Sequence, residues 1–257
     1  IIFLSGSFLN IFSYTSTETL FALGLVLYIL RICELENNQS KKNLLYVCLA
    51  FVLTFTSRYI GAYLLIFNLL LILIAFKNQK RYSKYLLVLL IFSSLYVCGY
   101  LLINKIASGY ITYSHAYMTY ESWQTISTQF IKKIFEEMNL VMASVRFGEN
   151  SIVATISSIL SLYLAYLLFA YLSKKKTLDL TLNNIANHFL YSGFLYLGIV
   201  FVWRLIIWFS PFSYRILFPS TLLITLGLLF KLLSKNDTYS QGFKKIYLAL
   251  CAIVIFS

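Results

Sequence analysis

The chain has 257 residues, of which 60% are hydrophobic and 12% are charged, and its formal net charge is +12. The apolar residues come in blocks of roughly twenty, the length that spans a bilayer core, so one soluble core cannot hide them. The basic residues lie in short clusters between these blocks, which excludes the continuous basic stripe of a nucleic-acid-binding protein. We therefore expect an all-α polytopic membrane protein that forms a single domain over residues 1–257 and binds no nucleic acid.

Nine apolar segments are predicted to cross the membrane as helices. Because the chain begins with Ile1 and stops inside an apolar run at Ser257, we expect the first and last segments to be truncated parts of a longer protein. The segments cover approximately residues 1–12, 18–33, 43–57, 60–76, 85–104, 152–173, 188–209, 214–233 and 245–257.

Alternate junctions between these segments carry most of the basic residues. Those junctions hold 14 of the 21 Lys and Arg residues: Arg31, Lys41, Lys42, Lys77, Lys80, Arg81, Lys84, Lys174, Lys175, Lys176, Lys231, Lys235, Lys244 and Lys245. By the positive-inside rule, this side is expected to be cytoplasmic. Glu18, Arg58, Arg204 and Arg215 then fall toward the outer face.

The longest polar stretch, residues 105–151, is predicted to be an outer loop. Within it, the sequence QFIKKIFEEMNLVMA separates apolar and charged residues onto two helical faces, which predicts an amphipathic helix at about 127–142 along the membrane surface. Both a plain surface helix and a flap that faces a substrate fit this pattern.

Charged side chains near membrane depth need a physical reason, because each costs about 2.5–3.5 kcal/mol at the centre of a span. Glu18 can cap a helix N-terminus, and Arg58 can extend its guanidinium to the interface. Arg204 lies deeper in its segment, and Arg215 opens the next one. The aromatic residues expected near these charges are Tyr14, Tyr59, Trp203, Trp208 and Tyr214. This combination suits a phosphate on a lipid carrier, because arginine binds phosphate as a bidentate fork while the lipid tail stays in the bilayer.

Other reactive side chains give weaker patterns. His115 and Glu121 lie in the outer loop, where they could contact a sugar or simply be solvated. The four cysteines have no metal-ligand spacing and are expected to pack as small apolar residues, so no metal site is predicted: Cys33, Cys48, Cys98 and Cys251. The chain also lacks the short motifs of nucleotide-binding proteins, serine hydrolases and zinc proteases.

The order of these features resembles the GT-C class of polytopic glycosyltransferases, in the bacterial branch related to protein O-mannosyltransferases and aminoarabinose transferases. The resemblance is carried by three stretches, STETLF, LAFVLTFTSRYIGAYLLIFNLLLILIAF and YRILFPSTLLITLGLL, with Glu18, Arg58 with Gly61, and Arg215 with Pro219 at the family positions. Thr19 stands where that branch commonly has proline, and Tyr214 precedes Arg215 instead of following it.

The resemblance implies transfer of a sugar, with inversion, from a polyprenyl-phosphate carrier to a glycan, lipid or protein acceptor. The transfer would occur on the extracytoplasmic face of a multi-pass protein in the bacterial cytoplasmic membrane, with no further cofactor. Arg58, Arg204 and Arg215 would then hold the phosphate, Glu18 would orient them, and Tyr59 and Tyr214 would lie beside the sugar. The catalytic residue is not identified, because the family's presumed catalytic Asp is expected upstream of Ile1.

Two other functions fit the same features. A surface-polysaccharide polymerase also acts on lipid-linked sugars outside the membrane, although a late outer loop would favour it and the long loop here is central. A polysaccharide flippase or other transporter would need polar groups near the middle of the bilayer or paired broken helices in two halves. The charges here gather instead at one face.

Overall fold

The computed structural model describes residues 16–109, 117–118, 121–138, 179–208, 212 and 214–234. This part of the chain is helical apart from two strands of two residues each. It divides into two compact units. We call them the α2–α5 unit, formed by Ser16–Tyr120 and Phe194–Phe209, and the α6–α9 unit, formed by Ile1–Thr15, Glu121–Gly193 and Ser210–Ser257. Helix α8 (Leu180–Ile206) contributes residues to both.

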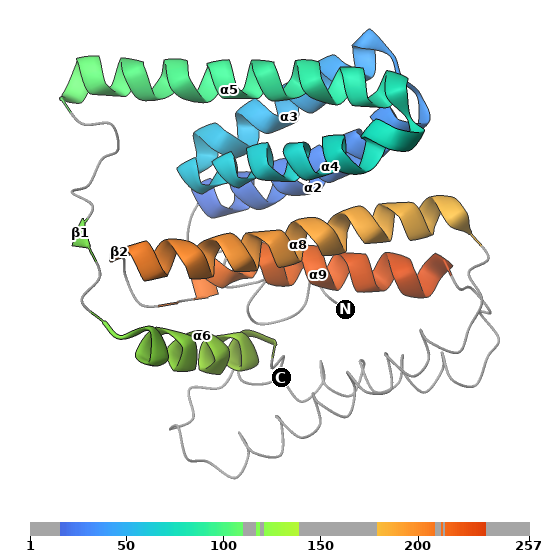
Figure 1. Cartoon of the computed structure of the whole chain (residues 1–257). Helices are drawn as coiled ribbons and strands as arrows, with labels where there is room; N and C mark the ends of the chain where they lie inside the picture. The colour runs from blue at the N-terminus through green and yellow to red at the C-terminus, as the bar shows by residue number, and fades with distance from the viewer. Residues whose placement is uncertain are drawn as a thin grey trace, which may run out of the picture. The chain divides into compact units, whose positions relative to one another are not determined.

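The α2–α5 unit contains four helices that lie alongside one another (Figure 1). Helix α2 packs on α3, and α5 packs on both α3 and α4. A single turn of 3-10 helix, η2, follows α3 and leads directly into α4. The bounds are α2 Ser16–Asn37, α3 Lys41–Ser57, η2 Tyr59–Ala62, α4 Tyr63–Asn78 and α5 Lys80–Ser108.

Short turns between the helices lie at the two ends of this unit. Arg81, at the start of α5, donates from Nη2 to the backbone oxygen of Gln39 in the α2–α3 turn, at 3.4 Å. The α2–α3 and α4–α5 turns therefore lie at one end, which we call the basic end. Arg58 lies between α3 and η2 at the other end of α3, which we call the Arg58 end. Both basic turns thus share one end of the unit.

Two short strands belong to the same unit. Strand β1 (Tyr117–Met118) pairs antiparallel with β2 (Ile207–Trp208), with Tyr117 opposite Trp208. Because β2 follows α8 without a break, the ladder connects the end of α8 to the segment beyond α5.

The α6–α9 unit contains α6 (Trp123–Met138), the first half of α8 and α9 (Tyr214–Ser234). Helix α6 packs against α9. The ring of Phe130 lies 5.0 Å from that of Phe212, just before α9. Lys231 of α9 donates to Oδ1 of Asn187 on α8 at 2.7 Å. This hydrogen bond gives the lysine ammonium a partner where α8 and α9 meet.

Four helical segments among the described residues are long and apolar enough to cross a membrane: Tyr59–Phe76, Lys80–Ser108, Leu180–Ile206 and Ile216–Ser234. The chain therefore has the character of a membrane protein. Helices α2 and α3 are not among the four; α3 has only 17 residues, and α2 carries three charges in its second half. The predicted segments 1–12, 152–173 and 245–257 lie outside the described residues.

Several helices extend beyond their predicted bounds. Helix α5 has 29 residues, against the predicted 85–104, and ends at Gly109, whose φ of 77° any other residue would adopt only with strain. Helix α8 begins eight residues before the predicted 188, because Oδ1 of Asp179 accepts the N–H groups of Thr181 and Leu182 at 2.8 and 3.0 Å. Polar residues thus continue the helices past the apolar blocks.

The amphipathic helix predicted at about 127–142 is a helix that begins earlier, at Trp123, and ends at Met138. Ile126 and Phe130 lie on its buried side toward α9 and Phe212, whereas Trp123 and Ile131 are exposed. Its position along a membrane surface remains a prediction.

Two glycines allow close contact inside the α2–α5 unit. A Cβ atom added to Gly24 on α2 would lie 2.6 Å from Thr54 Oγ1 and 3.1 Å from the Thr54 backbone. The Thr54 hydroxyl already donates to the Ala50 carbonyl at 2.7 Å, so moving it away would break this hydrogen bond. A Cβ atom on Gly61 would meet the Phe55 backbone at 3.0 Å. Small residues of this kind let helix backbones approach closely within a membrane.

Gly24→Ala is expected to destabilise the protein by about 1–3 kcal/mol, because the added methyl overpacks the α2–α3 contact. Gly99→Ala is the matched control: Gly99 also lies inside a helix, but nothing stands within 4 Å of an added Cβ. That control should be neutral or stabilising by up to about 1 kcal/mol. Unfolding in mixed detergent micelles, followed by circular dichroism, measures both changes. Equal effects of the two substitutions would contradict the close contact at Gly24.

Candidate functional site

Glu18 and Arg58 meet at the Arg58 end. Glu18 lies in the first turn of α2, and its Oε1 is 3.7 Å from Nη2 of Arg58. The carboxylate side chain is 9% exposed, whereas the guanidinium side chain is 30% exposed. Thr17 donates its hydroxyl to the other carboxylate oxygen at 3.1 Å. The pair therefore combines a buried anion with a cation that solvent or a ligand can still reach.

The backbone around Arg58 explains why its side chain lies there. Arg58 ends α3 with φ −153° and ψ 130°, an extended conformation, and its N–H still bonds to the Thr54 carbonyl. The next residues form the 3-10 turn η2, in which the Gly61 N–H bonds to the Arg58 carbonyl at 2.9 Å. Arg58 is thus the single extended residue between two helical segments. Its backbone is bonded on both sides, which fixes the base of its long side chain.

Aromatic residues from three helices pack together near the start of α2, which carries Glu18, and the start of α4, which follows Arg58 in the chain. The ring of Tyr196 on α8 lies 5.1 Å from that of Tyr63 at the start of α4, edge to face, and 6.5 Å from that of Phe21 on α2. Tyr196 is buried, and its hydroxyl has no hydrogen-bond partner among the described residues. Tyr196 therefore packs a buried phenol ring against aromatic residues of α2 and α4.

A second aromatic group follows α3 and α5. Phe51, Phe55 and Tyr59 recur every fourth residue, as do Phe92, Tyr96 and Tyr100 on α5. The Phe55 ring lies 5.5 Å from that of Tyr100, edge to face. Tyr59 is also close to Tyr100, and its hydroxyl accepts from Nδ2 of Asn104 at 2.9 Å. Tyr59 is thus held by polar and aromatic contacts beside Arg58, as an exposed residue.

Arg204 lies about two turns beyond Tyr196 on α8 and is completely buried, with an exposed fraction of 0%. A buried guanidinium is costly unless neighbouring groups stabilise it, so its surroundings must be polar enough to hold it. Because its side chain is fully buried, direct contact with a bound phosphate would require rearrangement. Arg204 therefore differs from Arg58 in what it can do chemically.

The remaining predicted site residues are only partly described. Arg215 and Tyr214 form the first turn of α9, in the α6–α9 unit, and their side chains lie outside the described residues. Glu121 is half-buried just before α6 in the same unit. His115 lies outside the described residues. The structure thus brings together Glu18 and Arg58 with Tyr59 beside them, and it does not relate them to Arg215, Tyr214 or Glu121.

Two aromatic residues at the site, Tyr63 and Tyr196, were missed by the sequence analysis, whereas Phe21 belongs to the STETLF stretch that carries the resemblance. Tyr63 continues the four-residue spacing of Phe55 and Tyr59, and this periodicity could have identified it. Tyr196 lies in an apolar run that contains several aromatic residues, and nothing in the sequence distinguishes it. Its role depends on contacts between segments far apart in the chain.

The described residues contain no group of three or more His, Cys, Asp or Glu that could hold a metal ion. Cys33 and Cys48 are buried free thiols, as expected of packing residues, whereas Cys98 is exposed on α5. Cys251 lies outside the described residues. Comparison with protein-family models, curated proteins and solved structures finds no match to the chain.

The Glu18–Arg58 pair is expected to contribute more to stability than the pair Arg31–Glu34, which is 37% and 50% exposed on one helix. A double-mutant cycle with Glu18→Gln and Arg58→Gln should give a coupling of about 1–2 kcal/mol, since burial weakens solvent screening. The same cycle with Arg31→Gln and Glu34→Gln should give no more than about 0.5 kcal/mol. Unfolding in mixed micelles measures both cycles, and equal couplings would contradict the difference in burial.

Proposed function

We propose that the protein is a membrane glycosyltransferase that takes a sugar from a polyprenyl-phosphate carrier. The observation that supports this most directly is the partly exposed Arg58 guanidinium, fixed by Glu18 at 3.7 Å at the end of a helix in an apolar unit. Arginine binds phosphate oxygens through a planar fork, and a lipid tail can remain against the apolar surface below it.

The chemistry of the transfer makes such an arginine useful. An acceptor hydroxyl attacks the anomeric carbon of the sugar, and the bond from that carbon to the phosphate oxygen breaks. The electron pair stays on the phosphate, which gains a second negative charge as it leaves. Arg58, which is partly exposed, would stabilise this developing charge. The hydroxyl proton passes to a general base, which is not assigned among the described residues.

The other residues take supporting roles in this proposal. Glu18 is buried and paired with Arg58, so it orients the guanidinium and does not take part as the base. Tyr59 stands next to Arg58 with its hydroxyl held by Asn104, which suits the face of a sugar ring. Arg204 adds positive potential from inside the unit. The resemblance of the sequence to GT-C glycosyltransferases suggests the same role for Arg215.

Arg58→Ala should lower sugar transfer by about 10²–10³-fold, the usual loss when a donor to a developing oxyanion is removed. The transfer rate of Arg58→Lys should lie between those of the unaltered protein and Arg58→Ala, because lysine keeps the positive charge but lacks the planar pair of donors. Proteoliposomes supplied with polyprenyl phosphates that carry labelled mannose or aminoarabinose, together with lipid and glycan acceptors, measure release of polyprenyl phosphate. Lys84→Ala, at an exposed position near the start of α5, is the matched control and should stay within about twofold.

Three outcomes separate the competing functions. Release of polyprenyl phosphate with one sugar added to each acceptor supports the glycosyltransferase. Growth of a long glycan on the carrier would favour a polysaccharide polymerase instead. Movement of the intact lipid-linked sugar across the membrane without release would favour a transporter. Full transfer activity in Arg58→Ala, with normal membrane insertion, would contradict the role of Arg58.

A further inference from the structure

Two cations gather around one exposed tyrosine at the basic end. The guanidinium of Arg31 on α2 lies 5.1 Å from the ring centroid of Tyr46 on α3, and the ammonium of Lys42 lies 5.8 Å from the same centroid. Each cation is attracted by the ring. The two cations also repel each other, because both lie over the same ring. An anion bound near both cations would offset this repulsion.

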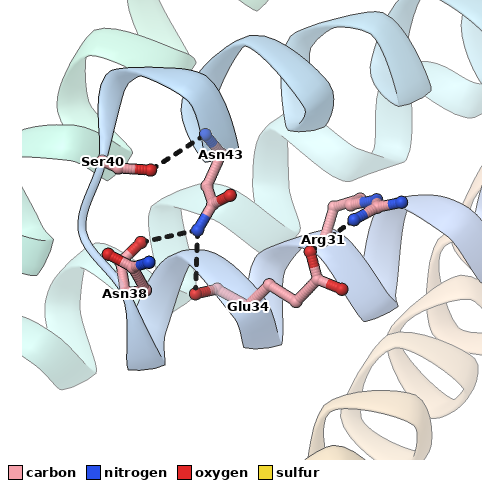
Figure 2. Close-up of polar contacts among 5 residues, drawn as sticks. All are labelled: Arg31, Glu34, Asn38, Ser40 and Asn43. Atoms are coloured by element: carbon pink, nitrogen blue, oxygen red, sulfur yellow. Dashed lines mark hydrogen bonds and ion pairs between the residues drawn. The ribbon is translucent and has the colours of Figure 1, made fainter.

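The fold holds these groups in place without any ligand. Figure 2 shows that Asn43 joins the two helices, since its Nδ2 donates to the backbone oxygens of Asn38 and Glu34 at 2.8 and 3.5 Å. The Asn43 N–H also donates to Oγ of Ser40, which caps α3, at 3.2 Å. This fixes the first turn of α3, which carries Lys42, against the last turns of α2.

The charge balance at this end favours an anion. Arg31 makes an ion pair with Glu34 one turn later on its own helix. Lys42 is the second cation over the Tyr46 ring. Across the end as a whole, the cations outnumber the carboxylates. The charged residues described there are Arg31, Lys41, Lys42, Lys80, Arg81 and Lys84 against Glu34 and Glu36.

An apolar surface begins directly beside the cations. Leu45 and Leu49 on α3 are 57% and 56% exposed, and they lie three residues after Lys42 and Tyr46 respectively. On a helix, residues three apart lie on the same side, so these leucines continue the Lys42 and Tyr46 side away from the basic end. The unit contains helices long and apolar enough to cross a membrane. The Lys42 and Tyr46 side of α3 therefore presents cations, then an aromatic ring, then exposed aliphatic side chains.

We propose that Arg31, Lys42 and Tyr46 bind the phosphate of an anionic phospholipid headgroup, with its acyl chain along Leu45 and Leu49. An amphiphile with a negative head is the one class of ligand that matches both parts of this surface. Zwitterionic lipids match the apolar part alone. The site is independent of the proposed glycosyltransferase activity, which concerns the Arg58 end.

Native mass spectrometry of the purified full chain tests this site with phosphatidylglycerol and phosphatidylcholine of the same acyl chains. Phosphatidylglycerol should bind more tightly, and Lys42→Gln or Arg31→Gln should each weaken it about fivefold without changing phosphatidylcholine. Tyr46→Phe should keep the affinity, and Tyr46→Leu should lower it. Lys105→Gln, an exposed lysine in the last turn of α5, is the matched control and should have no effect.

Three results would overturn the proposal. The first is phosphatidylglycerol binding that Lys42→Gln and Arg31→Gln leave unchanged, or that Lys105→Gln weakens equally. The second is displacement of the lipid by millimolar inorganic phosphate, which would show a site for a free anion. The third concerns salt and uses the unaltered protein. Raising ammonium acetate from about 0.1 to about 1 M shortens the screening length to about 3 Å, so it should weaken the binding of phosphatidylglycerol more than that of phosphatidylcholine. An unchanged preference at high salt would contradict a headgroup site.

Discussion

The arrangement of helices in the α2–α5 unit depends on how charged side chains are stabilised beside apolar helices. A charged group in such surroundings is costly unless a partner of opposite charge or a hydrogen bond stabilises it. Glu18 satisfies this requirement through Arg58 at 3.7 Å and the Thr17 hydroxyl. Because the two partners come from different helices, the pair also fixes where the start of α2 lies against the end of α3.

Close backbone contact makes that arrangement possible. Gly24 lets α2 approach the Thr54 backbone, and Gly61 lets η2 fold back onto the end of α3. Thr54 and Arg58 are one turn apart on α3, so the contact at Gly24 and the pair with Glu18 act on the same stretch of helix. Packing and charge therefore support one register between α2 and α3, and a shift of either helix would lose both.

The sequence predicted the helical class and six helices at nearly their observed positions, because their apolar blocks are long and are separated by polar turns. It also predicted Glu18 and Arg58 as unusual charges, since lone ionisable residues stand out in apolar runs. It could not predict that the two form a pair, because they are forty residues apart and only the packing of α2 on α3 brings them together. Tyr196 could not be predicted for the same reason: it lies in an apolar helix with several aromatic residues, and its position beside Tyr63 depends on tertiary contacts.

The two ends of this unit use the same residue types in different ways. Arg31 pairs with Glu34 within one helix, a spacing that any helix provides, and both side chains are well exposed. Arg58 pairs with a buried carboxylate on another helix, so the positions of both depend on the fold. An exposed pair can adjust to a lipid headgroup that needs only positive charge nearby. A reaction that separates charge instead needs donors whose positions are set before the substrate arrives. This difference favours chemistry at the Arg58 end and lipid contact at the basic end.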